Sequence, residues 1–162
     1  MAHRSNPPVT VDEYERMIEA GLLTKDDHVE LIEGDIVEME PIGAAHAGCV
    51  DALTNLFRFR APAEVLLQVQ GPVLLLPQSM PQPDVALIRA RPHGYRRERP
   101  RPADIILLIE VCDSSFQRDL RDKVPLYARA GVPEVWLVHL AGQRLLRFLE
   151  PSGSEWRRTD VL

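Results

Sequence analysis

The sequence has few cysteines and no long apolar run. Cys49 and Cys112 are the only cysteines in 162 residues, and they have neither CxxC spacing nor a cluster of histidines beside them. This pattern argues against a structural zinc site and a disulfide framework, so we expect two free thiols in a reducing, cytoplasmic compartment. No apolar stretch approaches the roughly 20 residues that a membrane-spanning helix needs. Residues 1–8 lack the apolar segment of a secretory signal, and we expect no membrane partner.

The sequence also lacks an excess of positive charge. Its formal net charge is −5, whereas proteins that coat nucleic acid are usually basic. The composition therefore argues against general nucleic-acid binding but leaves room for a local basic surface. Between residues 89 and 101 six arginines accompany one acid: Arg89, Arg91, Arg96, Arg97, Arg99 and Arg101. We expect a proline-containing loop here that either contacts DNA phosphates or is solvated with no partner, and the residues favour neither alternative.

The composition is typical of one globular domain, with 45% hydrophobic and 27% charged residues. We expect residues 1–8 to form a flexible N-terminal arm and residues 9–162 a single domain. The mixture of helical and strand patterns predicts an α/β fold with a mixed central sheet flanked by helices, preceded by an N-terminal helix and a β-hairpin.

Local signals place the individual elements. Thr10 and Glu13 have the spacing of a capping box, and Gly34 marks the turn of the hairpin. Helices are predicted at about 10–20, 44–60 and 116–130, and strands at 29–32, 36–39, 65–69, 73–76, 84–88, 105–111, 134–139 and 144–148, with a further edge strand around Trp156. The segment from 104 to 139 is a βαβ unit, so its two strands should be parallel.

Two acids stand at the ends of apolar strands. Glu110 follows Ile105–Ile109, a run typical of a strand covered on both faces. A carboxylate buried there needs a metal ion, a cation or a raised pKa, unless the strand ends first and Glu110 faces water. Asp84 opens its own apolar strand and alone is best explained as a turn residue. If the two strands are neighbours, the two acids meet, and Mg²⁺ needs only a few carboxylate oxygens besides water.

Other polar residues gain a role only beside these acids. Glu33, in the hairpin turn, is alone best explained as an exposed acid. Asp119 and Lys123 are four residues apart on a predicted helix, which suits either a surface ion pair or a lysine that leans towards the acids. Cys112 shares a strand face with Glu110 and offers no positive charge there.

Several segments, in this order and spacing, resemble the Uma-two family of restriction endonucleases, a branch of the PD-(D/E)XK nuclease superfamily. The resemblance extends from about Val9 to Phe148. It rests on residues 30–39, Pro41, His46, Gln82–Ala86, Ile109–Ser115, Asp119, Lys123, Tyr127–Ala128 and Gly131–Val138. It implies a restriction-endonuclease-like core. Departures from the family pattern include Cys112–Ser115 and a proline, Pro125, inside the helix that carries Lys123.

The resemblance also implies a set of site residues. Asp84 matches the motif aspartate, Glu110 the second acid and Glu33 a further acid, and these three would hold Mg²⁺ or Mn²⁺. Lys123 matches the motif lysine, moved from the strand to the neighbouring helix, and would complete the catalytic set. Four more residues would line the site: His46, Tyr127, Cys112 and Asp119.

The function that this predicts is metal-dependent hydrolysis of phosphodiester bonds in DNA by a homodimeric endonuclease. The arginine loop lies in sequence between Asp84 and Glu110, so we expect it to flank the site. The alternative is a catalytically inactive nuclease-fold module that binds nucleic acid or protein, favoured by the acidic composition and by Pro125. An acyl or glycosyl hydrolase is disfavoured because the sequence has no G-x-S-x-G motif.

Overall fold

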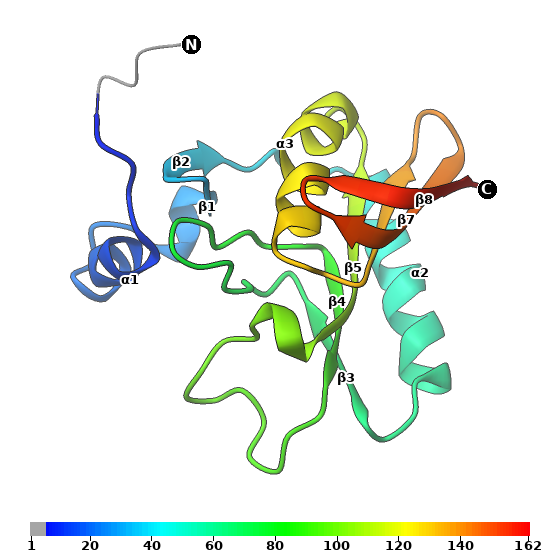
Figure 1. Ribbon diagram of the computed structural model, residues 1–162, viewed down its shortest axis with the longest axis horizontal. Helices are drawn as coiled ribbons and strands as arrows, with labels where there is room; N and C mark the ends of the chain where they lie inside the picture. The colour runs from blue at the N-terminus through cyan, green and yellow to red at the C-terminus, as the bar shows by residue number, and fades with distance from the viewer. Residues whose placement is uncertain (1–5) are drawn as a thin grey trace.

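The computed structural model describes residues 6–162, which form two sheets and three α-helices (Figure 1). The elements in chain order are α1 (Val11–Glu19), β1 (Val29–Ile32), β2 (Asp35–Glu38), α2 (Ala44–Arg60), β3 (Val65–Val69), β4 (Val85–Arg89), β5 (Ile105–Cys112), α3 (Phe116–Arg129), β6 (Glu134–His139), β7 (Arg144–Ser152) and β8 (Glu155–Val161). Short 3₁₀ turns lie at Lys25–Asp27 and Pro102–Asp104. The predicted mixed α/β fold is confirmed.

The large sheet has six strands in the order β3-β4-β5-β6-β7-β8. Only β5 and β6 run parallel, as the βαβ pattern predicted, and every other neighbouring pair is antiparallel. The strand β5 is buried along nearly its whole length, which agrees with its unbroken apolar sequence.

Two helices cover opposite faces of this sheet (Figure 1). From α2, Val50 packs with alternate residues of β4 and β5 such as Val85 and Ile109. From α3, Tyr127 packs against the other face, in the cluster that contains Leu108. Successive strand residues point to opposite faces, so from Leu107 to Cys112 the even-numbered residues of β5 face α3 and the odd-numbered ones face α2.

The N-terminal part forms a separate layer. The helix α1 begins with the predicted capping box of Thr10 and Glu13, and β1 and β2 form a two-stranded sheet of their own. The turn between them has positive φ at Glu33 and Gly34, the conformation that tight hairpins favour. The hairpin joins the rest of the molecule through an isolated bridge from Leu31 to Met80.

Some boundaries differ from the prediction. Residues 73–76 form no strand, because their only β-pairing is a bridge between Leu75 and Ser79 in a local turn. Of the predicted arm, residues 1–8, the first five lie outside the described residues. Residues 6–8 are exposed and form no helix or strand. Within residues 6–162, no helix is long and apolar enough to cross a membrane, and both cysteines are free thiols.

Candidate active site

The acids at the ends of β4 and β5 lie opposite each other across a strand pair. The register pairs Val85 with Ile109 and Ala86 with Leu108 in antiparallel fashion, so one further step places Asp84 opposite Glu110. Asp84 itself precedes β4, so its own contacts and not the strand ladder fix the direction of its side chain. The Val111 backbone N–H donates to Asp84 Oδ2 at 2.8 Å, which ties the Asp84 carboxyl to β5 beside Glu110.

Glu110 is a buried carboxylate with two donors on one oxygen. Its exposure is 3%, and its side chain faces α3 because its neighbours on that face, Leu108 and Cys112, pack in the α3 cluster. Lys123 Nζ lies 3.2 Å from Glu110 Oε1, and the Tyr127 hydroxyl donates to the same oxygen. Among residues 6–162 both hydrogen bonds to this carboxyl go to Oε1, and no donor reaches the second oxygen, Oε2.

Burial and the neighbouring charges shift the pKa of Glu110. Burial raises the pKa of Glu110 well above its ordinary value, Lys123 opposes this shift, and three further carboxylates reinforce it: Asp119, Asp84 and Glu30. Burial alone would lower the pKa of Lys123, but the attraction of Glu110 and Glu30 raises it overall. Lys123 is thus a permanent cation and not a base at neutral pH.

Pro125 does not displace this lysine from the acids. It lies inside α3 and leaves one backbone donor out of the helical ladder. The helix nevertheless continues to Arg129, and Lys123 reaches Glu110 from the turn before the proline. Pro125, the departure from the family pattern that favoured an inactive module, therefore leaves Lys123 in contact with Glu110.

The sequence predicted Glu33 as the hairpin acid of this site, but the hairpin acid that contacts Lys123 is Glu30. Glu30 is 3% exposed and lies 3.0 Å from Lys123 Nζ through its Oε1 atom. Glu33, in the turn, is half exposed and pairs with Arg129 at the far end of α3. The turn conformation explains the difference, because it directs Glu33 away from the strand face that Glu30 occupies.

Asp84 has a second polar neighbour at the start of α2. His46 Nε2 lies 3.1 Å from Asp84 Oδ1, and both side chains are mostly buried. The other ring nitrogen of His46, Nδ1, is buried and has no hydrogen-bond partner among the described residues. The structure therefore places His46, a predicted site-lining residue, beside Asp84.

Asp119 and Cys112 form a buried polar contact near Glu110. Asp119 Oδ2 accepts hydrogen bonds from the Cys112 thiol at 3.1 Å and from the Ser115 hydroxyl at 2.7 Å. Burial, with Asp119 and Glu110 nearby, raises the pKa of Cys112, so this thiol stays protonated as a donor. Asp119 does not pair with Lys123 on the surface, because Lys123 turns inward to Glu30 and Glu110.

The cluster has more negative than positive groups. Its acids are Asp84, Glu110, Glu30 and Asp119, and Lys123 is the cation that pairs with two of them. Among residues 6–162 no three His, Cys, Asp or Glu side chains converge as a ready-made ligand set. Mg²⁺, however, is commonly held by one or two carboxylates and several waters. Asp84 and Glu110, at adjacent strand ends, could supply that number of carboxylates.

A family model described as "Uma2: Putative restriction endonuclease" matches residues 11–162. The chain belongs to the Uma2 family. A crystal structure described as a "putative nuclease belonging to DUF820 from Anabaena variabilis" superposes with a TM-score of 0.67 and 17% identity, over 96% of this chain and 84% of that one. This likeness shows that the two chains share a fold. No curated protein matches the chain.

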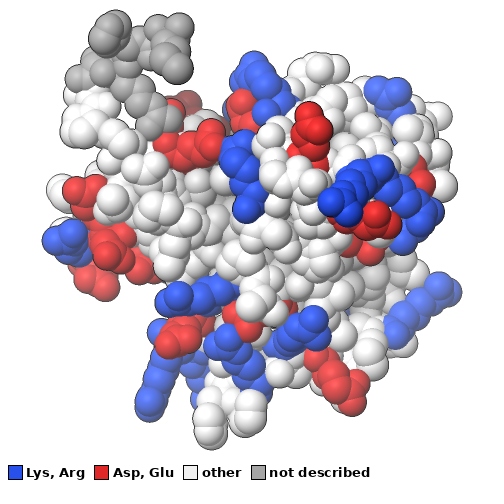
Figure 2. Space-filling view, in the orientation of Figure 1, with Lys and Arg blue, Asp and Glu red and all other residues white. Residues whose placement is uncertain are grey.

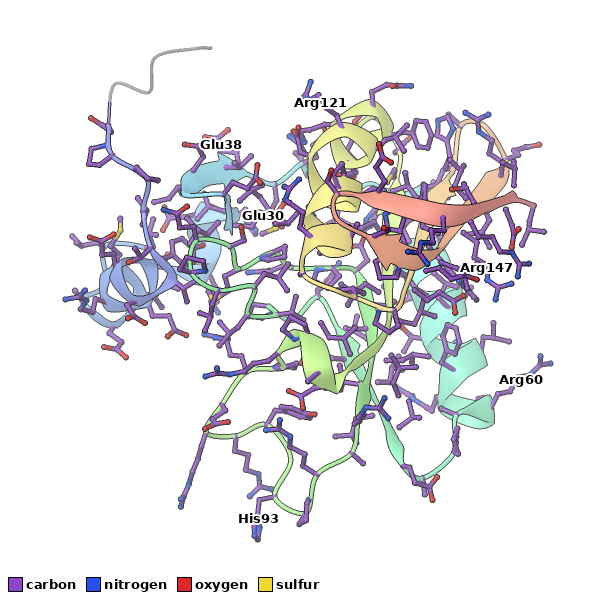
Figure 3. All side chains as sticks on the ribbon, in the orientation of Figure 1. Glu30, Glu38, Arg60, His93, Arg121 and Arg147 are labelled. Atoms are coloured by element: carbon purple, nitrogen blue, oxygen red, sulfur yellow. The ribbon has the colours of Figure 1, made fainter. Side chains whose placement is uncertain are left out.

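In this Uma2 member the arginine loop lies at the opposite end of the sheet from the acids. The strands β4 and β5 are antiparallel neighbours, so their connection follows Arg89, whereas Asp84 precedes β4. At about 3.3 Å per residue, the five residues of β4 separate the two by roughly 17 Å. Figure 3 shows His93 at the far end of this loop, away from Glu30. The expectation that the loop flanks the site is corrected.

Half of the loop's arginines are bound within the Uma2 chain itself. Arg91 pairs with Asp104 and Glu98, Arg99 pairs with Glu15, and Arg89 donates to the Ala103 carbonyl. Three arginines have no hydrogen bond or ion pair from their side chains within residues 6–162: Arg96, Arg97 and Arg101. Figure 2 shows lysine and arginine side chains gathered over this part of the surface, with acidic groups between them.

Proposed function

We propose that the protein is a metal-dependent endonuclease that hydrolyses phosphodiester bonds in DNA. The observation that carries the proposal is the placement of Asp84 opposite Glu110 at the ends of β4 and β5, with Lys123 on Glu110. Membership of the Uma2 family supports the same activity. Two acids and a lysine at one end of a strand pair suit phosphoryl chemistry, in which positioning and charge stabilisation supply most of the rate.

Each residue has a role that follows from its contacts. Asp84 and Glu110 would hold Mg²⁺ or Mn²⁺, and a bound ion would supply an acidified water and positive charge for the phosphate. His46 and the Val111 N–H fix the two oxygens of Asp84. Lys123, which stays charged, would stabilise the negative charge that builds up on the phosphate or orient the attacking water. Tyr127 keeps Glu110 oriented through its hydroxyl.

The proposal is tested by incubating purified protein with supercoiled plasmid in Mg²⁺, in Mn²⁺ and in chelator. Wild type should nick or cut only with metal, and Asp84→Asn and Glu110→Gln should each lower the rate by at least about 100-fold, the scale of losing a charged group at the reacting phosphate. Glu33→Gln is the matched control and should cut like wild type, because Glu33 pairs with Arg129 outside the cluster. Absence of cutting with every metal, or cutting that survives both site substitutions, contradicts the proposal.

The proposal assigns DNA binding to the three arginines of the loop that have no side-chain partner within residues 6–162. Arg96, Arg97 and Arg101 are exposed and free to contact phosphates, which position a protein on DNA without reading its sequence. They also carry the alternative function, a nucleic-acid-binding module without catalysis. That alternative predicts a salt-sensitive shift of DNA in a gel with no cutting in any metal.

Cutting both strands of a duplex takes two sites, so the proposal includes a homodimer. Sedimentation of the purified protein, alone and with a short DNA duplex, measures this directly. A species of twice the chain mass is expected, and a monomer that still makes double-strand breaks in one event contradicts the dimer.

A further inference from the structure

Glu30 joins three parts of the candidate active site that come from distant stretches of the chain. Its Oε1 lies 3.0 Å from Lys123 Nζ on α3. Its Oε2 accepts a hydrogen bond from the Gln82 backbone N–H at 3.0 Å, two residues before Asp84. With both oxygens engaged and 3% exposure, Glu30 is held in place and is not a surface charge.

The backbone around Glu30 is fixed by the same segment that leads to Asp84. Next to it, Leu31 bridges Met80, and the Met80 N–H donates to the Leu31 carbonyl at 2.8 Å. The Ser79 hydroxyl accepts from the Glu33 N–H at 2.8 Å. These contacts make β1 a support for residues 79–82, so the position of Glu30 relative to the start of β4 is set by backbone as well as by side chain.

Lys123 is shared almost equally between two carboxylates. Its Nζ lies 3.0 Å from Glu30 and 3.2 Å from Glu110. With Glu30 removed, Glu110 would be the remaining carboxylate in contact with the ammonium, which would lose the contact that holds it on the hairpin side. An ammonium held only by Glu110 competes with any other cation for that carboxylate and no longer has a fixed place beside it.

We propose that Glu30 is a positioning residue, which acts through Lys123 and not on the substrate. It holds the ammonium at a fixed point beside Glu110, so that the second oxygen of Glu110 remains open and Lys123 meets the phosphate in one geometry. This inference rests on the proposed nuclease function. It also makes a claim about Lys123 alone, which is measurable without metal or DNA.

The chain is well suited to that measurement because it contains two lysines, Lys25 and Lys123. Lys25 is exposed and serves as an internal reference. In protein labelled with ¹³C and ¹⁵N at lysine, the Lys123 ammonium should exchange its protons more slowly than Lys25 does. Glu30→Gln should shift the Lys123 signals and speed that exchange, and Glu33→Gln, the same change three residues away, should leave them as in wild type. If the Lys123 chemical shifts and proton exchange rate are the same in Glu30→Gln as in wild type, the inference is wrong.

Kinetic assays test whether the position of the Lys123 ammonium affects the rate of DNA cleavage. Glu30→Gln should lower kcat by about 10–100-fold, the usual cost of losing a group that orients an active residue, with KM for DNA unchanged. In a Lys123→Met background the same substitution should cost little more, since its effect runs through Lys123. Full additivity of the two losses, or a change in KM instead of kcat, overturns the inference.

A folding defect does not remove the test. Should Glu30→Gln fail to fold at the assay temperature, Glu30→Asp keeps the charge but draws the carboxylate back from Lys123, and it enters the same NMR and kinetic comparison with the same expected signs. Failure of the inference is distinct from failure of the proposed function. If wild type cuts DNA and the Glu30 variants cut equally fast, only the inference about Glu30 is wrong. If wild type does not cut DNA at all, the proposed nuclease function is wrong.

Discussion

Asp84 Oδ2 accepts a hydrogen bond from the Val111 N–H at 2.8 Å, one residue beyond Glu110. The Asp84 carboxylate thus accepts a backbone hydrogen bond from β5 that a carbonyl of a neighbouring strand would usually accept. The consequence is that Asp84 has a structural task in addition to any role with a cation. Variants of Asp84 therefore separate the two roles.

The first prediction uses that hydrogen bond. Asp84→Ala leaves the buried Val111 N–H without its acceptor and should lower the free energy of unfolding by about 1–3 kcal/mol. Asp84→Asn keeps an oxygen at the same place and should cost clearly less, although both variants lose the charge. Urea denaturation in chelator measures the difference. Equal losses for the two variants would show that the hydrogen bond contributes nothing.

The second prediction concerns the buried lysine. Lys123→Met leaves Glu30 and Glu110 buried without their cation, and breaking such a pair typically costs about 3–5 kcal/mol. The exposed Lys25→Met is the control and should stay within about 0.5 kcal/mol of wild type. Combining Lys123→Met with Glu110→Gln should cost less than the sum of the single losses, because Glu110 no longer contributes an unpaired charge beside Glu30. A strictly additive double variant would argue against the pair.

The third prediction is a dependence of stability on pH. Burial raises the pKa of Glu110 above its ordinary 4.5, so the folded protein holds this proton more tightly than the unfolded chain does. The resulting stabilisation is fully present below about pH 4.5 and is lost as pH rises through the raised pKa. In chelator, the free energy of unfolding of wild type minus that of Glu110→Gln should therefore fall as pH rises. A difference that stays flat or grows with pH contradicts the shift.

The fourth prediction concerns the arginine loop. Replacing Arg96 and Arg97 by Glu should weaken DNA binding and make its salt dependence shallower, by about 0.9 in log–log slope for each phosphate that the loop no longer neutralises. Arg157→Glu changes an exposed arginine on β8 and serves as the control. Fluorescence anisotropy with a DNA duplex at several salt concentrations gives both quantities. Unchanged affinity and slope would mean that the loop has no partner in DNA.

Much of the fold follows from local sequence. The apolar run of β5 predicted a strand buried on both faces, and the spacing of β5, α3 and β6 predicted their parallel pairing, which the register confirms. Residues 73–76 have similar composition, but their β-pairing is limited to the bridge between Leu75 and Ser79, where the chain turns back on itself. Apolar character alone does not say whether a partner strand is within reach.

The acids were harder to place than the strands. Glu33 came from the family resemblance, yet taken alone it was an exposed turn acid, and that simpler explanation agrees with the structure. Glu30 had a signal that could have found it: a charged residue between Val29 and Leu31 in an apolar strand needs a partner. Its partner, Lys123, is far away in sequence, and contacts between the hairpin and residues 78–82, among them the bridge from Leu31 to Met80, bring Glu30 to it.

The location of the arginine loop shows the same limit. Its place in sequence between Asp84 and Glu110 suggested a place beside them. The loop instead connects two antiparallel strands, so it lies at the end away from both acids. Whether a connection lies near or far from a site depends on strand direction, which the composition of the loop does not encode.

The central claim is that Asp84 and Glu110 hold one divalent ion. Crystals of the wild-type protein soaked in Mn²⁺ and measured for anomalous scattering test it most directly. We expect an anomalous peak within about 2 Å of an oxygen of each carboxylate, and none in crystals of Glu110→Gln treated in the same way. Full Mn²⁺ occupancy elsewhere with no density between Asp84 and Glu110 would contradict it.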